Sequence, residues 1–304
     1  MNGKYRVYDD GRLIAEIPNV ITTEGKKIIT RFLAKNNNAW AGAMCVGAGR
    51  STPDASDKTL NFEYARFPIY YSYGLYDTTY KIIFKAMMPE NFAGSIEELG
   101  MYSQVSNQSS TAYASEFSLF DNINEWTATG VTAVEQPSIA TIASNSDSRV
   151  KTGTAGYYVT GTGNLYKAFS SVQFGEYALT DSFSLAYGLS TSATISIRFE
   201  KDASNYFYSN VSGGSAGQNN IYTFTKTSMT QTGSLSWTDV TGIRIVISAN
   251  SGGVYLDGLR PVVINHYNED YGLVSRAINT GAEDSLIKRA GSRLDLEYEV
   301  TLNL

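Results

Sequence analysis

The sequence of 304 residues has few of the side chains that most often bind metals or form cross-links. It contains one cysteine, Cys45, and one histidine, His266. An internal disulfide and a zinc site built from clustered His and Cys are therefore both excluded. No apolar run approaches the roughly 20 residues that span a bilayer. The start of the chain lacks an apolar signal core, so we expect a protein made in a cytoplasm.

Charge is also scarce. Asp, Glu, Lys and Arg make up 17% of the residues, against roughly 25% in an average soluble domain. The formal net charge is −5, the pI is near 5.1, and no run of Lys and Arg exceeds two residues. A basic footprint for nucleic acid and a cationic membrane patch are both missing. We therefore expect neither nucleic acid nor a membrane as a partner.

Apolar and aromatic residues fill a large share of the chain. Hydrophobic residues account for 42% and aromatic ones for 12%, with 22 Tyr against 3 Trp. Tyrosine suits pleated, half-exposed strands, and it offers a rigid apolar ring with a polar tip for contact surfaces. The length suggests about two domains. Composition thus favours a β-rich protein built for binding or assembly.

The first hundred residues contain hairpin, helix and strand signals. Asp9-Asp10-Gly11 lies between two apolar runs, which predicts a β-hairpin. Thr22 or Thr23 can cap a helix whose apolar residues continue to Leu33 at helical spacing. Residues 61–73 are interpreted as one strand.

The last eleven residues carry the cleanest strand signal. Apolar and polar residues alternate from Leu294 to Leu304, which predicts a half-buried strand. We expect this strand to complete a sheet made by the N-terminal region. Its apolar residues are also our candidates for assembly contacts: Leu294, Leu296, Tyr298, Val300 and Leu302.

The middle of the chain has a different pattern. Short alternating strands such as 194–199 and 242–247 are separated by polar turns, which is typical of a sandwich. The fold class predicted is mainly β: a discontinuous base domain with one amphipathic helix, residues 1–114 together with 264–304. An inserted β-sandwich, residues 115–263, is expected between the two parts of the base.

The middle segment resembles the jelly-roll domains of carbohydrate-binding modules. The stretches that carry the resemblance are residues 121–126, 181–185, 195–199, 236–245 and 254–259. The resemblance implies a structural calcium ion near Asp121 and Asp257, although two carboxylates alone do not satisfy a hard cation. A simpler interpretation of Asp257 is a turn cap.

Carbohydrate binding would need aromatic rings with amide partners. The candidates are Tyr187, Tyr206, Tyr208 and Asn205. Packing within the protein, or a protein interface, is the alternative role for these tyrosines.

The flanking segments resemble structural proteins of tailed phages. The carrying stretches are residues 21–28, 40–49, 59–63, 96–102 and 274–277 leading to 294–298. This resemblance implies a location on the virion surface, other virion proteins such as major capsid or tail proteins as partners, and a homotrimer.

Catalytic signals are weak. Glu97 and Glu98 are adjacent in a predicted strand and would point to opposite faces, so they cannot cooperate across one sugar bond. The chain has no Gly-x-Ser-x-Gly nucleophile elbow to accompany His266. The sequence therefore favours a non-enzymatic structural protein on the phage surface, with head decoration preferred. A tail, baseplate or fibre protein that binds host surface polysaccharide is the alternative, and a stand-alone glycan-binding protein or depolymerase is a further one.

Overall fold

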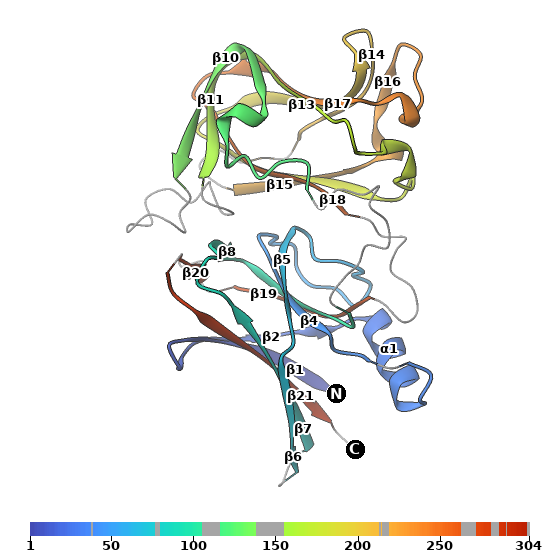
Figure 1. The fold of residues 1–304 in the computed structure, drawn as a ribbon, viewed down its shortest axis with the longest axis vertical. Helices are drawn as coiled ribbons and strands as arrows, with labels where there is room; N and C mark the ends of the chain where they lie inside the picture. Colours follow the sequence, from blue (N-terminus) through green and yellow to red (C-terminus); the bar gives the residue numbers. More distant parts are fainter. Residues whose placement is uncertain are drawn as a thin grey trace. The chain divides into compact units, whose positions relative to one another are not determined.

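The computed structural model describes residues 1–37, 39–76, 80–104, 116–137, 155–212, 214, 219–262, 272–280, 286–289 and 291–302. The protein is mainly β (Figure 1). Contacts between residues divide the chain into two compact units: Met1–Asn107 with His266–Leu304, here unit 1, and Gln108–Asn265, here unit 2. Both junctions expected from the sequence, after residues 114 and 263, lie outside the described residues, as does His266.

One sheet of unit 1 joins the two ends of the chain. Its order is β2-β1-β21-β7-β6. The central strand β21 pairs antiparallel with β1 on one side and with β7 on the other. The prediction of a discontinuous, β-rich N- and C-terminal unit is confirmed. The bounds are β1 Asn2–Asp9, β2 Arg12–Pro18, β6 Tyr71–Tyr76, β7 Tyr80–Met88 and β21 Leu294–Leu302.

A second sheet of unit 1 has the order β3-β19-β9-β4-β5, and β20 pairs separately with β8. The single strand expected over residues 61–73 is wrong, because the chain changes sheets between β5 and β6. The bounds are β3 Val20–Ile21, β4 Ala43–Gly47, β5 Glu63–Pro68, β8 Gly94–Ile96, β9 Glu98–Tyr102, β19 Leu273–Ile278 and β20 Leu286–Lys288.

Local sequence explains the first turn and the helix. Asp10 and Gly11 have φ of 48° and 78°, the left-handed pair that a tight two-residue hairpin turn requires. The helix α1 spans Thr23–Leu33, and the Thr22 side chain accepts a hydrogen bond from the Gly25 N–H at 2.8 Å. Ile28 and Ile29 are buried in the core of unit 1. The hairpin and the capped helix predicted from the sequence are both confirmed.

The β21 residues that were predicted to make assembly contacts lie in the core of unit 1. Leu294, Leu296, Tyr298 and Val300 are at most 3% exposed, and Leu302 packs against the same cluster. Tyr298 packs on Tyr5 of β1 with ring centroids 4.7 Å apart. These side chains hold unit 1 together, so an assembly contact has to use other residues.

A buried ion pair fixes the loop between β4 and β5. Glu98 on β9 is fully buried and accepts hydrogen bonds from the N–H groups of Gly49, Asn61 and Phe62. The Arg276 guanidinium on β19 lies 2.9 Å from Glu98 and 2.8 Å from Asp57. Burial raises the pKa of Glu98 above its ordinary value, against the opposing effects of Arg276 and of the Phe62 and Asn61 N–H groups. Glu98 and Arg276 thus have an architectural role.

The outer face of the β2-β1-β21-β7-β6 sheet carries paired charges. Glu299 on β21 lies 2.8 Å from Arg6 on β1 and 3.2 Å from Lys81 on β7. Glu297 lies 2.7 Å from Lys85 and accepts a hydrogen bond from the Tyr8 hydroxyl. Alternation along each strand separates this charged face from the apolar core face. The pairs tie three adjacent strands together.

Unit 2 is a β-sandwich of nine strands. Eight form one continuous path, β15-β12-β18-β11-β17-β13-β14-β16, and the ninth, β10, pairs with β11. The strand β11 joins the two layers, since residues 157–159 pair with β18 and residues 163–168 pair with β17. Gly161 and Gly163, with φ of 83° and 153°, lie at this transition and permit the bend. The inserted sandwich predicted from the sequence is confirmed.

Here the layer β15-β12-β18-β11 is called the first layer, and β11-β17-β13-β14-β16 the second. The strand bounds are β10 Thr127–Pro137, β11 Ala155–Ala168, β12 Ser182–Leu189, β13 Ala193–Asp202, β14 Asn205–Asn210, β15 Asn219–Thr225, β16 Thr230–Thr232, β17 Gly242–Asn250 and β18 Val254–Val262. Short 3₁₀ turns are η1 Ile123–Glu125, η2 Phe174–Glu176, η3 Lys226–Ser228 and η4 Trp237–Asp239.

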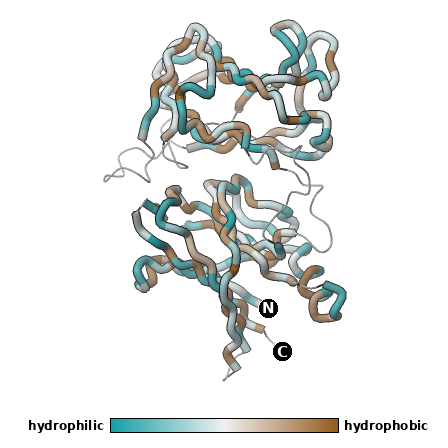
Figure 2. Tube along the Cα trace, viewed as in Figure 1, coloured by the Kyte–Doolittle hydropathy of each residue, from teal (hydrophilic) through white to brown (hydrophobic). Residues whose placement is uncertain are grey.

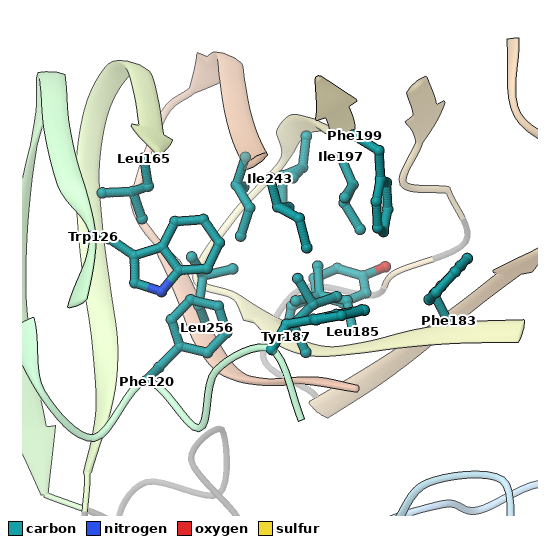
Figure 3. Close-up of a cluster of buried hydrophobic side chains, with 14 of the residues drawn as sticks. Phe120, Trp126, Leu165, Phe183, Leu185, Tyr187, Ile197, Phe199, Ile243 and Leu256 are labelled. Atoms are coloured by element: carbon teal, nitrogen blue, oxygen red, sulfur yellow. The ribbon is translucent and has the colours of Figure 1, made fainter. Parts of the chain in front are cut away.

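The core of unit 2 lies between these layers (Figure 3). Phe183, Leu185 and Tyr187 of β12 face Ile197 and Phe199 of β13 across it (Figure 3). Along the chain, apolar segments alternate with polar ones instead of forming one long run (Figure 2). Within the described residues, no helix has both the length and the apolar character needed to cross a bilayer.

Candidate functional site

The outer face of the second layer brings aromatic and charged side chains into one row. Tyr208 on β14 lies opposite Arg198 on β13, which lies opposite Arg244 on β17, which lies opposite Tyr166 on β11. All four are partly exposed. The residues next to the two arginines on their own strands, such as Ile197, Phe199 and Ile245, point the other way and are buried in the core, as strand alternation requires. We call this face, with the neighbouring Tyr206, Glu200 and Asn164, the platform face.

The platform face extends across the width of the second layer. In Figure 1, β13 and β17 form the middle of the second layer, and β10 on one side and β14 with β16 on the other rise above them. Thr230 and Thr232 of β16 extend the rows beyond Tyr208 and Tyr206. The platform face is thus a polar and aromatic surface that crosses several strands.

Arg244 occupies the middle of the row and is fully engaged. Its Nε and Nη2 donate to the two carboxylate oxygens of Glu200 at 2.8 and 2.6 Å, and Nη1 donates to the side chain of Asn164. Its guanidinium carbon lies 4.6 Å from the centre of the Tyr166 ring. The hydrogen bonds from Glu200 raise the pKa of Arg244 further above its ordinary value. A bidentate pair of this kind holds both side chains in one orientation.

Arg198 has a different environment. Its guanidinium carbon lies 4.3 Å from the centre of the Tyr206 ring, a cation–π contact. Its Nε is buried without a hydrogen-bond partner. Tyr206 and Tyr208 lie on the same side of β14, with ring centroids 6.0 Å apart. The two rings and the guanidinium therefore form one cluster on the platform face.

The structure brings together only some of the predicted sugar-binding residues. Tyr206 and Tyr208 share the platform face. Asn205 lies at the end of that strand, where its amide donates to Asp202 and its oxygen accepts from the Ser234 N–H. Tyr187 is 3% exposed and belongs to the core (Figure 3), so its inclusion as a platform residue is wrong. All of β12 is buried, and no alternation there distinguished one face from the other.

Arg198, Arg244, Glu200 and Tyr166 were missed by the sequence interpretation. The three strands that carry them are separated by tens of residues, and only the register of the sheet aligns them. One local signal was available: Arg198 and Arg244 each stand between apolar residues at i±1 in a strand. That pattern predicts an outward-facing arginine, although it does not predict which arginines meet.

The two predicted calcium ligands both lie near the start of β11, since Ala155 contacts Asp121 and Tyr157 pairs with Leu256, the neighbour of Asp257. Asp121 accepts a hydrogen bond from the Ala155 N–H at 3.0 Å. Asp257 is buried on β18, at a bulge where Ala186 and Tyr187 of β12 pair with Gly258 and Leu256. Among the described residues, no group of three or more His, Cys, Asp and Glu side chains could hold a metal ion. Calcium, which takes six to eight oxygen ligands, stays a prediction from the sequence resemblance.

The chemistry available on the platform face is that of recognition. Aromatic rings can stack on the apolar faces of sugars, and fixed donors and acceptors can bind hydroxyl groups. Within the rows that run from β11 to β14, Glu200 is the one carboxylate of the described platform face, and it is committed to Arg244. Glycoside hydrolysis ordinarily uses two carboxylates placed across the scissile bond.

No protein-family model matches the chain, and no curated protein matches it. Several solved structures are similar. One is a family 11 carbohydrate-binding module from Clostridium thermocellum in complex with a mixed-linked tetrasaccharide, with 13% identity and a TM-score of 0.36 over 50% of this chain and 97% of the module. Another is the family 22 module of Xyn10B from the same organism, with 11% identity and a TM-score of 0.33 over 52% and 98%.

A phage protein is also among the similar structures. The enzymatically active domain of tailspike protein 4 from bacteriophage CBA120 has 15% identity and a TM-score of 0.31, over 54% of this chain and 21% of that one. At such low identities and TM-scores, these likenesses carry no argument about a ligand or a site.

Proposed function

We propose that this chain is a non-catalytic glycan-binding protein, and that the platform face of unit 2 binds the carbohydrate. The observation that carries the proposal is the aligned row of Tyr208, Arg198, Arg244 and Tyr166, with Tyr206 beside it. The Glu200–Arg244 pair fixes the polar groups before a ligand arrives, which lowers the entropic cost of binding. The commitment of Glu200 to that pair supports a binding role over hydrolysis.

The test is a glycan array probed with the full chain, followed by titration calorimetry on the glycans that bind. The double variant Tyr206→Ala/Tyr208→Ala should lower the affinity about 100-fold, since each stacked ring contributes about tenfold. Tyr76→Ala is the matched control, because Tyr76 is 79% exposed and lies on β6 in unit 1. Its affinity should equal that of the natural chain.

Two results would overturn this function. The first is the absence of binding to any glycan, and the second is unchanged affinity in the double variant while its thermal unfolding matches that of the natural chain. Release of reducing ends from a bound polysaccharide would contradict the non-catalytic assignment and favour a depolymerase.

We further propose that unit 1 docks the protein onto the surface of a phage particle, with head decoration preferred over tail or fibre. An edge strand of unit 1 supports a contact with other proteins. Among the described strands, β6 pairs with β7 alone. It contains no charged residue, and its Tyr71, Leu75 and Tyr76 are exposed. The opposite edge strand β2 carries Arg12, Glu16 and Pro18, which protect an edge against pairing.

Electron microscopy of intact particles, labelled with antibody against the full chain, tests this second role. Label at the head lattice, with a copy number divisible by three, is the expected result. Label on the tail would replace head decoration by the tail or fibre alternative. Particles without label would overturn the virion assignment and leave the glycan-binding proposal standing.

A further inference from the structure

The platform face contains two arginines that differ in how their charge is balanced. Arg244 forms a bidentate pair with Glu200. Arg198 has no hydrogen bond or ion pair within the described part of the chain. Its guanidinium makes a cation–π contact with the neutral Tyr206 ring. Glu200, the nearest carboxylate in the row, is already occupied on both of its oxygens. The platform face therefore carries one positive charge that no carboxylate of the described residues neutralises.

The two terminal nitrogens of the Arg198 guanidinium are accessible. The Nε atom of Arg198 is buried without a partner, whereas Nη1 and Nη2 are not among the buried unpartnered atoms. The contact with the Tyr206 ring orients the guanidinium of Arg198, and Tyr208 lies directly opposite Arg198 on the next strand. The two Nη atoms can thus bind a planar or tetrahedral anion end-on between the two rings, in the manner that a guanidinium binds a carboxylate.

A purely structural arginine would be expected to have a different arrangement. A buried donor without a partner destabilises a fold. Arg244 on the neighbouring strand has a carboxylate partner, Glu200, whereas Arg198 has none among the described residues. The chain as a whole is acidic, with a net charge of −5. General electrostatics would therefore repel a polyanion, so that any preference for one has to come from a local group.

We infer that the glycan bound by the platform face is acidic, and that an anionic group on the sugar pairs with Arg198. This inference rests on the proposed glycan-binding function and specifies its ligand class. The rings of Tyr206 and Tyr208 would hold neighbouring sugars, and Arg198 would select the charged one. Arg244 would take no part in the selection, since Glu200 cancels its charge.

The experiment uses matched pairs of ligands that differ only in charge. Oligogalacturonates and alginate oligosaccharides are titrated into the full chain, each beside its fully methyl-esterified form. We expect an acid form to bind at least about tenfold tighter than its ester, the gain expected of one charge-assisted contact. This preference should shrink as salt is raised, because added ions screen an exposed charge.

Three variants locate the effect. Arg198→Met should reduce the ratio of acid-form affinity to ester affinity to about one. Arg12→Met, which removes an exposed positive charge from β2 in unit 1, is the matched control and should keep the preference. Tyr206→Ala/Tyr208→Ala should weaken binding of both forms together.

The outcomes separate this inference from the function on which it rests. Equal binding of acid and ester, with both weakened by the tyrosine double variant, would overturn the inference and leave glycan binding intact. A preference that persists in Arg198→Met would also overturn it. If these acidic sugars and their esters do not bind while neutral glycans on the array do, the inference fails alone. If no glycan of any kind binds, both proposals fail.

Discussion

Unit 1 and unit 2 each direct a polar sheet face away from their cores, and the two faces treat charge differently. On unit 1, Glu299 is paired with cations from the strands on both sides, and Glu297 is paired with Lys85. On unit 2, Glu200 balances Arg244, and Arg198 rests on a tyrosine ring. A face with balanced charges has little left to offer a ligand. A face with an unbalanced charge among partly exposed rings can offer a ligand both a charge to pair with and a ring to stack on.

Buried cations are held in two different ways. Arg276 in unit 1 is paired with Glu98 and Asp57. Lys226 in unit 2 donates to the backbone oxygens of Phe174 and Tyr177 and lies 4.7 Å from the centre of the Trp237 ring. Unit 1 has an example of the second kind too, since the fully buried Lys288 donates to the backbone oxygens of Phe92 and Arg289. The loop between β4 and β5 therefore depends on a buried ion pair, whereas backbone oxygens serve the buried lysine of each unit.

The largest expected effect is in unit 1. Arg276→Met leaves the buried Glu98 carboxylate without its cation, and breaking a buried pair in this way costs about 3–5 kcal/mol. Denaturant unfolding of the full chain should show the transition of unit 1 shifted by that amount, with the transition of unit 2 unchanged. A loss below about 1 kcal/mol, an effect typical of an exposed pair, would break the contrast between the units.

The next effect is a pH dependence in unit 2. Burial lowers the pKa of Lys226 to about 8, from 10.5 when the side chain is free. Between these values the unfolded chain holds a proton that the folded chain has lost, so that the free energy of unfolding rises with pH. We expect unit 2 to gain about 2 kcal/mol between pH 8 and pH 10 from this group.

Chemical unfolding at pH 8, 9 and 10, compared between the natural chain and Lys226→Met, checks this expectation. The variant is expected to be less stable at every pH, since two carbonyl oxygens lose their donor, and to lack the rise. The same slope in both proteins would assign the pH dependence to other groups.

The sequence predicted features that depend on neighbouring residues and did not predict those that depend on distant strands. The period-2 pattern from Leu294 and the Thr22 cap are local, and the strand and helix they predict were found. Tyr206 and Tyr208 are two residues apart, so a strand had to place them on one face. The row on the platform face depends on register between β11, β13 and β17, which no local pattern specifies.

A smaller effect is expected on the charged face of unit 1. Glu299→Gln removes the carboxylate that joins Arg6 to Lys81, and we expect a loss of about 1–2 kcal/mol for hydrogen bonds to charged groups that are mostly buried. Glu16→Gln, which alters a more exposed partner of Arg6, should cost less than about 0.5 kcal/mol. Equal losses in the two variants, measured by denaturant unfolding, would show that position on the sheet does not matter.

The smallest effect is expected where the charge is unbalanced. Arg198→Met should change the stability of unit 2 by no more than about 0.5 kcal/mol, since no ion pair or hydrogen bond of the described residues is lost. Thermal and denaturant unfolding measure this directly. A loss above about 1.5 kcal/mol would mean that Arg198 supports the fold, and the comparison between the two faces would lose its basis.

The most direct measurement of the central claim is a crystal structure of the full chain with an oligosaccharide selected from the array. The prediction is a sugar lying across the outer face of the second layer, stacked on Tyr206 or Tyr208 and within hydrogen-bond distance of Arg198. A sugar bound on another surface, with the platform face empty, would rule out the platform face as the binding site.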